Sequence, residues 1–323
     1  MNKIYPWQQY QWQQIQQRNT LGRMPHSLLL SGVKGLGKYE FAQQLANSMF
    51  CLAPEEDGAA CGGCKACQLI QAGTHPDFHI VGLEDSKVIK IDQIRSLCIT
   101  LGKKPQMGGY RVAIISPADA MNTNAANGLL KTLEEPGEKT LLILLSSQPA
   151  SLPATIRSRC QKVNFTVPET LEAEKWLKQQ SDSNETSLLL ALSGGAPLNA
   201  LAYIEENRLQ TRGEFIQEFL GLKTGVQNPL HMADKWNKQQ PAYCLSWMTS
   251  WVMDLIRLKS SVENEQLMNK DHQKHLQPMA SELDLKNLFG FLDKLGQCSR
   301  QLGTQVNLQL LFEDLFITWI KIR

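Results

Sequence analysis

One glycine-rich stretch, SGVKGLGKYEFA at residues 31–42, restricts the possible folds of this chain more than any other. The apolar run at 27–30 predicts a buried strand before this loop, and residues 39–50 predict a helix after it. Strand, loop and helix in this order indicate an α/β unit whose loop N–H groups could hold phosphate. A glycine-rich turn without a ligand is the alternative. The residues that fit the phosphate-binding pattern G-x-x-x-x-G-K-[ST] are Gly32, Gly35, Gly37 and Lys38.

The residues that would hold Mg²⁺ in an ATPase of this kind are missing at two places. A Ser or Thr ordinarily ends the loop and binds the metal, and the phenol of Tyr39 cannot take over that role. A second buried strand is predicted over 111–115, and Ser116 follows it where an ATPase carries Asp. Asp119 comes three residues later and is expected to cap the next helix. We therefore predict no ATP hydrolysis, while nucleotide binding stays open.

Four cysteines follow the predicted helix with the spacing C-x9-C-x2-C-x2-C. Gly62 and Gly63 allow the tight turn that a chelating segment needs, and four thiolates are the tetrahedral ligand set of structural Zn²⁺. His75 lies just downstream, but four sulfurs complete the coordination without it. Because no coordination position stays open, the predicted zinc is structural rather than catalytic. The predicted ligands are Cys51, Cys61, Cys64 and Cys67.

Length and composition restrict the protein class. A chain of 323 residues can form two or three domains with hydrophobic cores. Its formal net charge of +2 excludes a strongly basic nucleic-acid coat, so any contact with DNA would be local or made through partners. The N-terminus lacks a signal-peptide core, and no apolar run approaches the roughly 18 residues of a transmembrane helix. We expect a soluble, cytoplasmic protein without membrane partners.

The order of the predicted elements indicates three domains. Five strands with interleaved helices predict a three-layer α/β domain over residues 1–166, with the cysteine segment 51–67 inserted in it. Short helices follow over 167–207, and helices with apolar stripes continue over 208–323. Within the last part, the polar segment 259–280 is predicted to be an exposed loop. In the first domain, Asp92 is predicted to be the N-cap of a helix.

Several motifs occur together in this chain. With them it resembles the clamp-loader subunits of bacterial DNA polymerase III, which have the AAA+ fold. The motifs are dense in the first half of the chain, whereas the C-terminal third is similar only in length and helical character. They are Tyr5-Pro6-Trp7, the loop at 32–39, the four-cysteine segment, Gly73-Thr74-His75-Pro76-Asp77, Ile91-Asp92-Gln93-Ile94-Arg95, Leu129-Leu130-Lys131-Thr132-Leu133-Glu134-Glu135-Pro136 and Ser158-Arg159-Cys160.

The resemblance implies a P-loop AAA+ domain, a small helical lid domain and an all-helical C-terminal collar domain. It implies the stator of a hetero-pentamer with ATPase subunits of the gamma/tau type and the delta subunit. Such a complex loads the sliding clamp onto primed DNA. An arginine that senses the γ-phosphate in the active ATPase subunits is absent after Gly194-Gly195, where Pro197, Leu198 and Asn199 stand. This third missing part again indicates a subunit that does not hydrolyse ATP.

The resemblance also implies a role for Arg159 of the Ser-Arg-Cys motif. In the family this arginine enters the ATP site of the neighbouring subunit as an arginine finger. A rigidly held guanidinium can neutralise charge that develops on the γ-phosphate. A surface salt bridge is the ordinary alternative for Arg159, and Arg157 is the second candidate for the finger.

Two other functions stay open at this point. One is an active clamp-loader ATPase of the gamma/tau type, which ATP turnover by the isolated protein would distinguish. The other is a zinc-dependent nucleic-acid-binding module, for which salt-dependent DNA affinity would be the sign. Lys65 is the one basic residue near the cysteines, which is too few for such a module.

Overall fold

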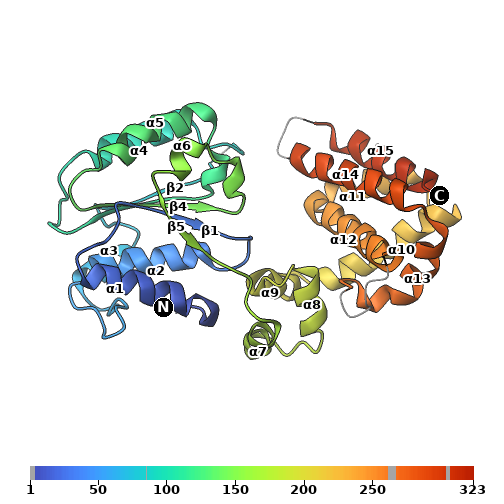
Figure 1. Cartoon of the computed structure of the whole chain (residues 1–323), viewed down its shortest axis with the longest axis horizontal. Coiled ribbons are helices and arrows are strands. Elements are labelled where there is room, and N and C mark those ends of the chain that lie inside the picture. The colour runs from blue at the N-terminus through green and yellow to red at the C-terminus, as the bar shows by residue number, and fades with distance from the viewer. Residues whose placement is uncertain (1–3, 85, 261–266, 303–305) are drawn as a thin grey trace. The chain divides into compact units, whose positions relative to one another are not determined.

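The computed structural model describes residues 4–84, 86–260, 267–302 and 306–323 (Figure 1). The chain divides into two compact units, residues 1–172 and 173–323. The division into three domains at 166/167 and 207/208 stays a prediction.

A five-stranded parallel sheet forms the centre of the first unit, in the order β2-β3-β4-β1-β5. The three middle strands are buried along their whole length, which explains their continuous apolar sequences. Residue 27 of β1 pairs with residue 142 of β4, and residue 28 with residue 161 of β5. The strands are β1 (Ser27–Ser31), β2 (Phe78–Val81), β3 (Arg111–Ile115), β4 (Thr140–Ser146) and β5 (Gln161–Asn164).

Helices cover both faces of this sheet. α1 and α2 lie on one face, and α4 and α5 lie on the other (Figure 1). The second pair packs its buried Ile, Leu and Ala side chains on apolar residues of β1, β3 and β4. The parallel sheet and the helices on its two faces form three layers, which confirms the predicted α/β fold. The helices are η1 (Pro6–Gln8), α1 (Gln9–Thr20), α2 (Lys38–Phe50), α3 (Lys65–Gln71), α4 (Ile91–Leu101), η2 (Ala118–Ala120), α5 (Thr123–Glu134), η3 (Pro149–Ser151) and α6 (Ala154–Arg157).

Two predicted helix caps in this unit are wrong. The N-cap of α4 is Lys90, two residues before the predicted Asp92, so Asp92 lies inside the first turn. The side chain of Gln93 reaches back and accepts a hydrogen bond from the Lys90 backbone N–H at 2.8 Å. Asp119 lies in η2, and the cap of α5 is Asn122, whose side chain accepts from the backbone of Ala125. In both places a neighbouring side chain satisfies the free backbone N–H groups.

Helices are the regular secondary structure of the second unit in the part of the chain that the structure describes. α7, α8 and α9 share one small apolar core, and the later helices share a larger one rich in Trp and Phe. Its helices are α7 (Thr170–Gln180), α8 (Thr186–Leu192), α9 (Pro197–Glu205), α10 (Arg208–Thr224), α11 (Pro229–Lys238), α12 (Pro241–Lys259), η5 (Lys270–His272), α13 (Gln273–Glu282), α14 (Leu285–Gln301) and α15 (Leu308–Lys321).

The segment at 259–280 is predicted to be an exposed loop. Its polar residues 270, 271, 274, 275 and 277 are exposed, but most of the described part is helical rather than a loop; residues 261–266 lie outside the described residues. Residues 273–282 form α13, and Asn269 is fully buried. The amide of Asn269 accepts from Arg212 at 2.6 Å and donates to Asp254 at 2.8 Å. Asn269 therefore pairs with buried charged groups of α10 and α12, a pattern that composition cannot distinguish from solvent exposure.

No single helix among the described residues is long and apolar enough to span a membrane. The short helices α8 and α9 reach that length and composition only as a pair that bends by 112° between them.

Candidate functional site

The predicted phosphate-binding loop lies between the carboxyl end of β1 and the first turn of α2. Gly35 and Gly37 have φ angles of 86° and 78°, which residues with a side chain rarely adopt. At Gly32 a Cβ atom would lie 2.3 Å from the carbonyl oxygen of Phe165, the residue that follows β5. The glycines are therefore needed for the path of the loop, whether or not phosphate binds.

Lys38 is engaged by the loop itself. Its Nζ donates to the carbonyl oxygens of Gly32 and Val33, each at 2.7 Å, and the residue is only 7% exposed. Burial lowers the pKa of Lys38, while the negative charges of Asp119 and Glu40 act in the opposite direction. The lysine thus holds the loop closed with two hydrogen bonds that a phosphate would have to replace.

Side chains of the N-terminal segment bind the backbone of the loop. The buried side chain of Gln8 donates to the carbonyl oxygens of Leu36 and Gly37, each at 2.8 Å. The indole of Trp7 donates to the same Leu36 oxygen at 3.0 Å and stacks on the ring of Tyr5. The burial of Gln8 was not predicted, because a glutamine in a Gln-rich segment gives no sign in the sequence that it is buried.

The positions expected to hold Mg²⁺ carry no carboxylate. Tyr39 lies half-buried in the first turn of α2, and burial raises the pKa of its phenol. Ser116 follows β3 and donates its backbone N–H to Val81. The carboxylate of Asp119 accepts from the backbone of Ser147 at 3.1 Å, which occupies one of its oxygens.

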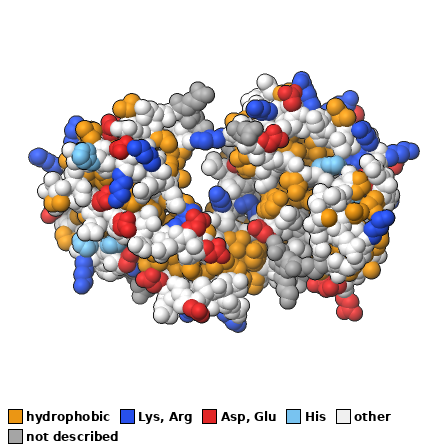
Figure 2. Space-filling view, turned by 180° about the vertical axis from the view of Figure 1, so that it is seen from behind, with side chains coloured by type: hydrophobic (Ala, Val, Ile, Leu, Met, Phe, Trp, Pro, Cys, Tyr) orange, Lys and Arg blue, Asp and Glu red, His pale blue; other side chains and the backbone are white. Residues whose placement is uncertain are grey.

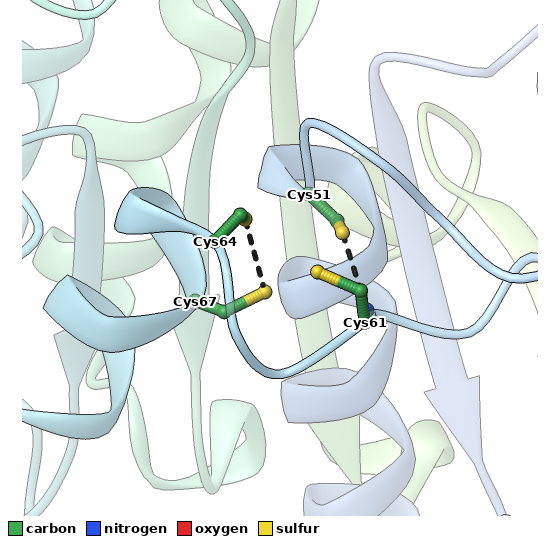
Figure 3. Close-up of side chains that lie close together, drawn as sticks. All are labelled: Cys51, Cys61, Cys64 and Cys67. Carbon is green, nitrogen blue, oxygen red and sulfur yellow. Dashed lines mark hydrogen bonds between the residues drawn. The ribbon is translucent and has the colours of Figure 1, made fainter.

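The four cysteines of the predicted zinc site converge (Figure 3). Their sulfur atoms all lie within 4.8 Å of one another, and Cys64 Sγ is 3.5 Å from Cys67 Sγ. Four sulfurs at about 2.3 Å from one tetrahedral Zn²⁺ would lie about 3.8 Å apart. The cluster can therefore bind a metal such as zinc after small adjustments. Cys51 caps the end of α2, Cys64 and Cys67 belong to the start of α3, and Cys61 comes from the loop between.

Backbone N–H groups favour the thiolate form at two of these positions. The N–H groups of Leu52 and Cys67 lower the pKa of Cys64 to about 6. Those of Cys64 and Gly63 lower the pKa of Cys61. Burial raises the pKa of Cys67 to about 12, which disfavours a bare thiolate there and leaves a metal ion as the means to ionise it.

Arg159 lies at the N-terminal end of β1, whereas the loop follows the carboxyl end of the same strand. The hydroxyl of Ser27, the first residue of β1, donates to the Arg159 carbonyl oxygen at 2.7 Å. The loop begins after Ser31, at the other end of the same strand. Because a strand rises roughly 3.3 Å per residue, about 13 Å of strand separates the two ends. The structure therefore does not bring Arg159 together with Lys38.

The guanidinium of Arg159 is held by its own unit. Its Nη2 lies 2.6 Å from a carboxylate oxygen of Glu134, and its Nη1 donates to the Thr155 carbonyl oxygen at 3.1 Å. The side chain is still 36% exposed. Arg157 belongs to α6, and its Nε is buried without a hydrogen-bond partner among the described residues. Glu134 was not predicted as a partner of Arg159, although it lies in the motif that ends in Glu134-Glu135-Pro136.

Family comparisons agree with the motifs. Residues 7–169 match the family described as "DNA polymerase III, delta subunit", and residues 206–321 match "DNA polymerase III, delta subunit, C terminal". A DNA polymerase III subunit delta' from Pseudomonas aeruginosa is 34% identical over 100% of this chain and 99% of its own length. The chain belongs to the DNA polymerase III delta-prime family. The delta' subunit of Escherichia coli is 30% identical, with 97% of this chain and 94% of that protein covered.

Family membership and the parallel sheet together confirm the AAA+ fold class for this delta-prime chain. They also confirm the clamp-loader family that the motifs indicated. The cysteine cluster and Arg159 both lie within the part that matches the first family description.

Proposed function

We propose that this delta-prime chain is the stator of a clamp loader. It joins ATPase subunits of the gamma/tau type and a delta subunit, and it helps to load the sliding clamp onto primed DNA. The observation that carries the proposal is the position of Arg159. This arginine is partly exposed and lies at the sheet edge opposite to its own loop. It is therefore available to a neighbouring subunit rather than to its own nucleotide site.

The proposed stator does not hydrolyse ATP. Phosphoryl transfer depends on a placed metal ion, and Tyr39 and Ser116 occupy the two metal-holding positions. The loop carbonyls already engage Lys38. In this proposal the loop supports the fold, and the N-terminal contacts of Gln8 keep it closed.

The proposed metal is one structural Zn²⁺, bound by Cys51, Cys61, Cys64 and Cys67. The convergence of four thiol groups in a small glycine-containing loop supports this proposal. Cys61 N–H donates to Cys51 Sγ at 3.2 Å, a contact that also stabilises a metal-bound thiolate. The zinc would fix the inserted segment to the end of α2 and would take no part in chemistry.

The proposed role of Arg159 is to stabilise charge on the γ-phosphate in the neighbouring ATP site. The test is Arg159→Ala in a reconstituted complex of all clamp-loader subunits. The variant should fold and assemble, whereas DNA-stimulated ATP turnover should fall. Arginine fingers contribute on the order of 10³ to 10⁵ in rate, but only one of several sites is affected, so the loss of total turnover should be partial.

Clamp loading should fall further than ATP turnover, because it needs concerted action of the sites. Arg159→Lys should not restore it, since an ammonium group lacks the planar fork of a guanidinium. Arg157→Ala is the internal control and should retain loading. If Arg157→Ala abolishes loading while Arg159→Ala does not, the finger is Arg157. If neither variant changes turnover or loading, the proposed action on a neighbour is wrong.

A further inference from the structure

Glu134 is fixed at the carboxyl end of α5, next to Arg159. The helix ends there because Pro136 cannot continue it. The side chain of Leu133 is buried, and the ring of His26 donates from Nε2 to the Leu133 carbonyl oxygen at 3.1 Å. This hydrogen bond ties the helix end to the residue that precedes β1. The backbone under Glu134 is therefore held by the core of the unit.

The backbone of Arg159 is anchored to the same edge of the sheet. Ser27, the residue after His26, donates to the Arg159 carbonyl oxygen at 2.7 Å. The Arg159 N–H donates to Ile156 at 3.1 Å, and the following Cys160 is buried. His26 and Ser27, which are adjacent at the start of β1, thus hold the helix end that carries Glu134 and the backbone of Arg159.

Between these two fixed points, the side chains meet. Arg159 Nη2 and Glu134 Oε1 are 2.6 Å apart, and Glu134 is the one carboxylate within 4 Å of Arg159 among the residues that the structure describes. The other branch of the guanidinium, Nη1, donates to the Thr155 carbonyl oxygen at 3.1 Å and to the Ser158 hydroxyl at 3.4 Å. One branch is therefore oriented by α6 and the other by α5.

We propose that Glu134 is a positioning residue that holds the Arg159 guanidinium in the orientation used toward a neighbouring ATP site. This inference rests on the proposed function of Arg159. A free arginine side chain samples many rotamers, and ordering it at the moment of reaction costs free energy. A carboxylate on a rigid helix end removes much of that freedom beforehand. An exposed ion pair of this kind adds little to the stability of the fold. We therefore expect loss of the ion pair to change the ATP turnover of the assembly rather than the stability of this chain.

The experiment compares Glu134→Ala, Glu134→Gln and Glu135→Ala in the reconstituted clamp-loader complex. Glu135 is the matched control, because it is the adjacent exposed carboxylate and has no ion pair in the described part of the chain. DNA-stimulated ATP turnover is measured over a range of ATP concentrations. Glu134→Ala should lower kcat without raising KM for ATP, by up to about 10²-fold at the affected site. Glu134→Gln should retain part of the rate, since an amide oxygen still accepts from Nη2, and Glu135→Ala should match the wild type.

The double variant Glu134→Ala/Arg159→Ala separates positioning from a general structural role. If Glu134 acts through Arg159, the double variant should be no slower than Arg159→Ala alone. A slower double variant, or faster turnover in Glu134→Ala, would overturn the proposal. Wild-type turnover in both Glu134 variants beside a slow Arg159→Ala would also overturn it and leave the proposed function intact. Wild-type turnover in Arg159→Ala would instead remove the proposed function on which the inference rests.

Discussion

At the scale of single residues, the loop depends on close contacts with side chains that are distant in sequence. Gly37 shows this most directly. A Cβ atom there would lie 2.5 Å from the ring of Tyr5 and 2.8 Å from the side-chain nitrogen of Gln8. The φ angle of 78° adds backbone strain for any residue with a side chain. Glycine is required at this position by the packing of the N-terminal segment as much as by any ligand.

We predict that Gly37→Ala lowers the stability of the first unit by about 1–3 kcal/mol. Hydrogen exchange of the β1 and α2 amides measures this, because these elements flank the loop. Gly213→Ala is the control, since Gly213 lies in the helix α10 with open space around its Cα. That substitution should stabilise its helix by up to about 1 kcal/mol. Unchanged exchange of β1 and α2 in Gly37→Ala would contradict the tight contact with Tyr5.

At the scale of elements, the cysteine segment has little support of its own. α3 spans seven residues, which is too short to be stable as an isolated helix. Ala66 and Cys67 are its buried residues, so few apolar contacts hold it to the sheet domain. A metal ion that joins α3 to the end of α2 would supply the missing restraint.

We predict that Cys64→Ser releases one Zn²⁺ per chain and loosens residues 51–70, while the sheet of the first unit stays folded. Elemental analysis measures the metal, and hydrogen exchange measures the loosening. Cys98→Ser is the matched control, because Cys98 lies in α4, where its thiol donates to Gly128. The control should keep its zinc. Freshly purified wild-type protein without metal, prepared in the absence of chelators, would contradict the zinc prediction.

At the scale of the whole molecule, the net charge and the described residues on the face in Figure 2 show no large basic surface. The formal net charge is +2, and Figure 2 shows Lys and Arg side chains interspersed with Asp and Glu over the face it displays. A large basic field is the usual sign of a protein that binds nucleic acid by itself. These properties favour a subunit that reaches DNA through its complex, in agreement with the proposed stator.

We predict that the isolated chain does not hydrolyse ATP at a measurable rate, because Tyr39 and Ser116 replace both metal-holding side chains. A phosphate-release assay at saturating ATP and Mg²⁺ tests this. Lys38→Ala identifies the source of any activity that is found. Turnover that disappears in this variant would show an active site in the loop and would favour an ATPase of the gamma/tau type.

The sequence by itself determined the features that depend on neighbouring residues. The apolar runs at 111–115 and 140–145 predicted buried strands, because a parallel strand covered on both faces needs apolar residues throughout. The cysteine spacing predicted the converging thiols, since a short loop cannot separate its ends widely. The motifs identified the clamp-loader family, which the full-length relatives confirm.

Tertiary structure decided the features that depend on contacts across the chain. The polar segment after residue 266 is partly buried, because Asn269 pairs with Arg212 and Asp254 from two other helices. Gln8 is buried for the same reason, since its partners are loop carbonyls 28 and 29 residues away. A polar side chain has the same sequence signature whether water or a distant backbone group satisfies it. Only the folded chain shows which of the two is present, because burial is set by what packs against a residue and not by the residue itself.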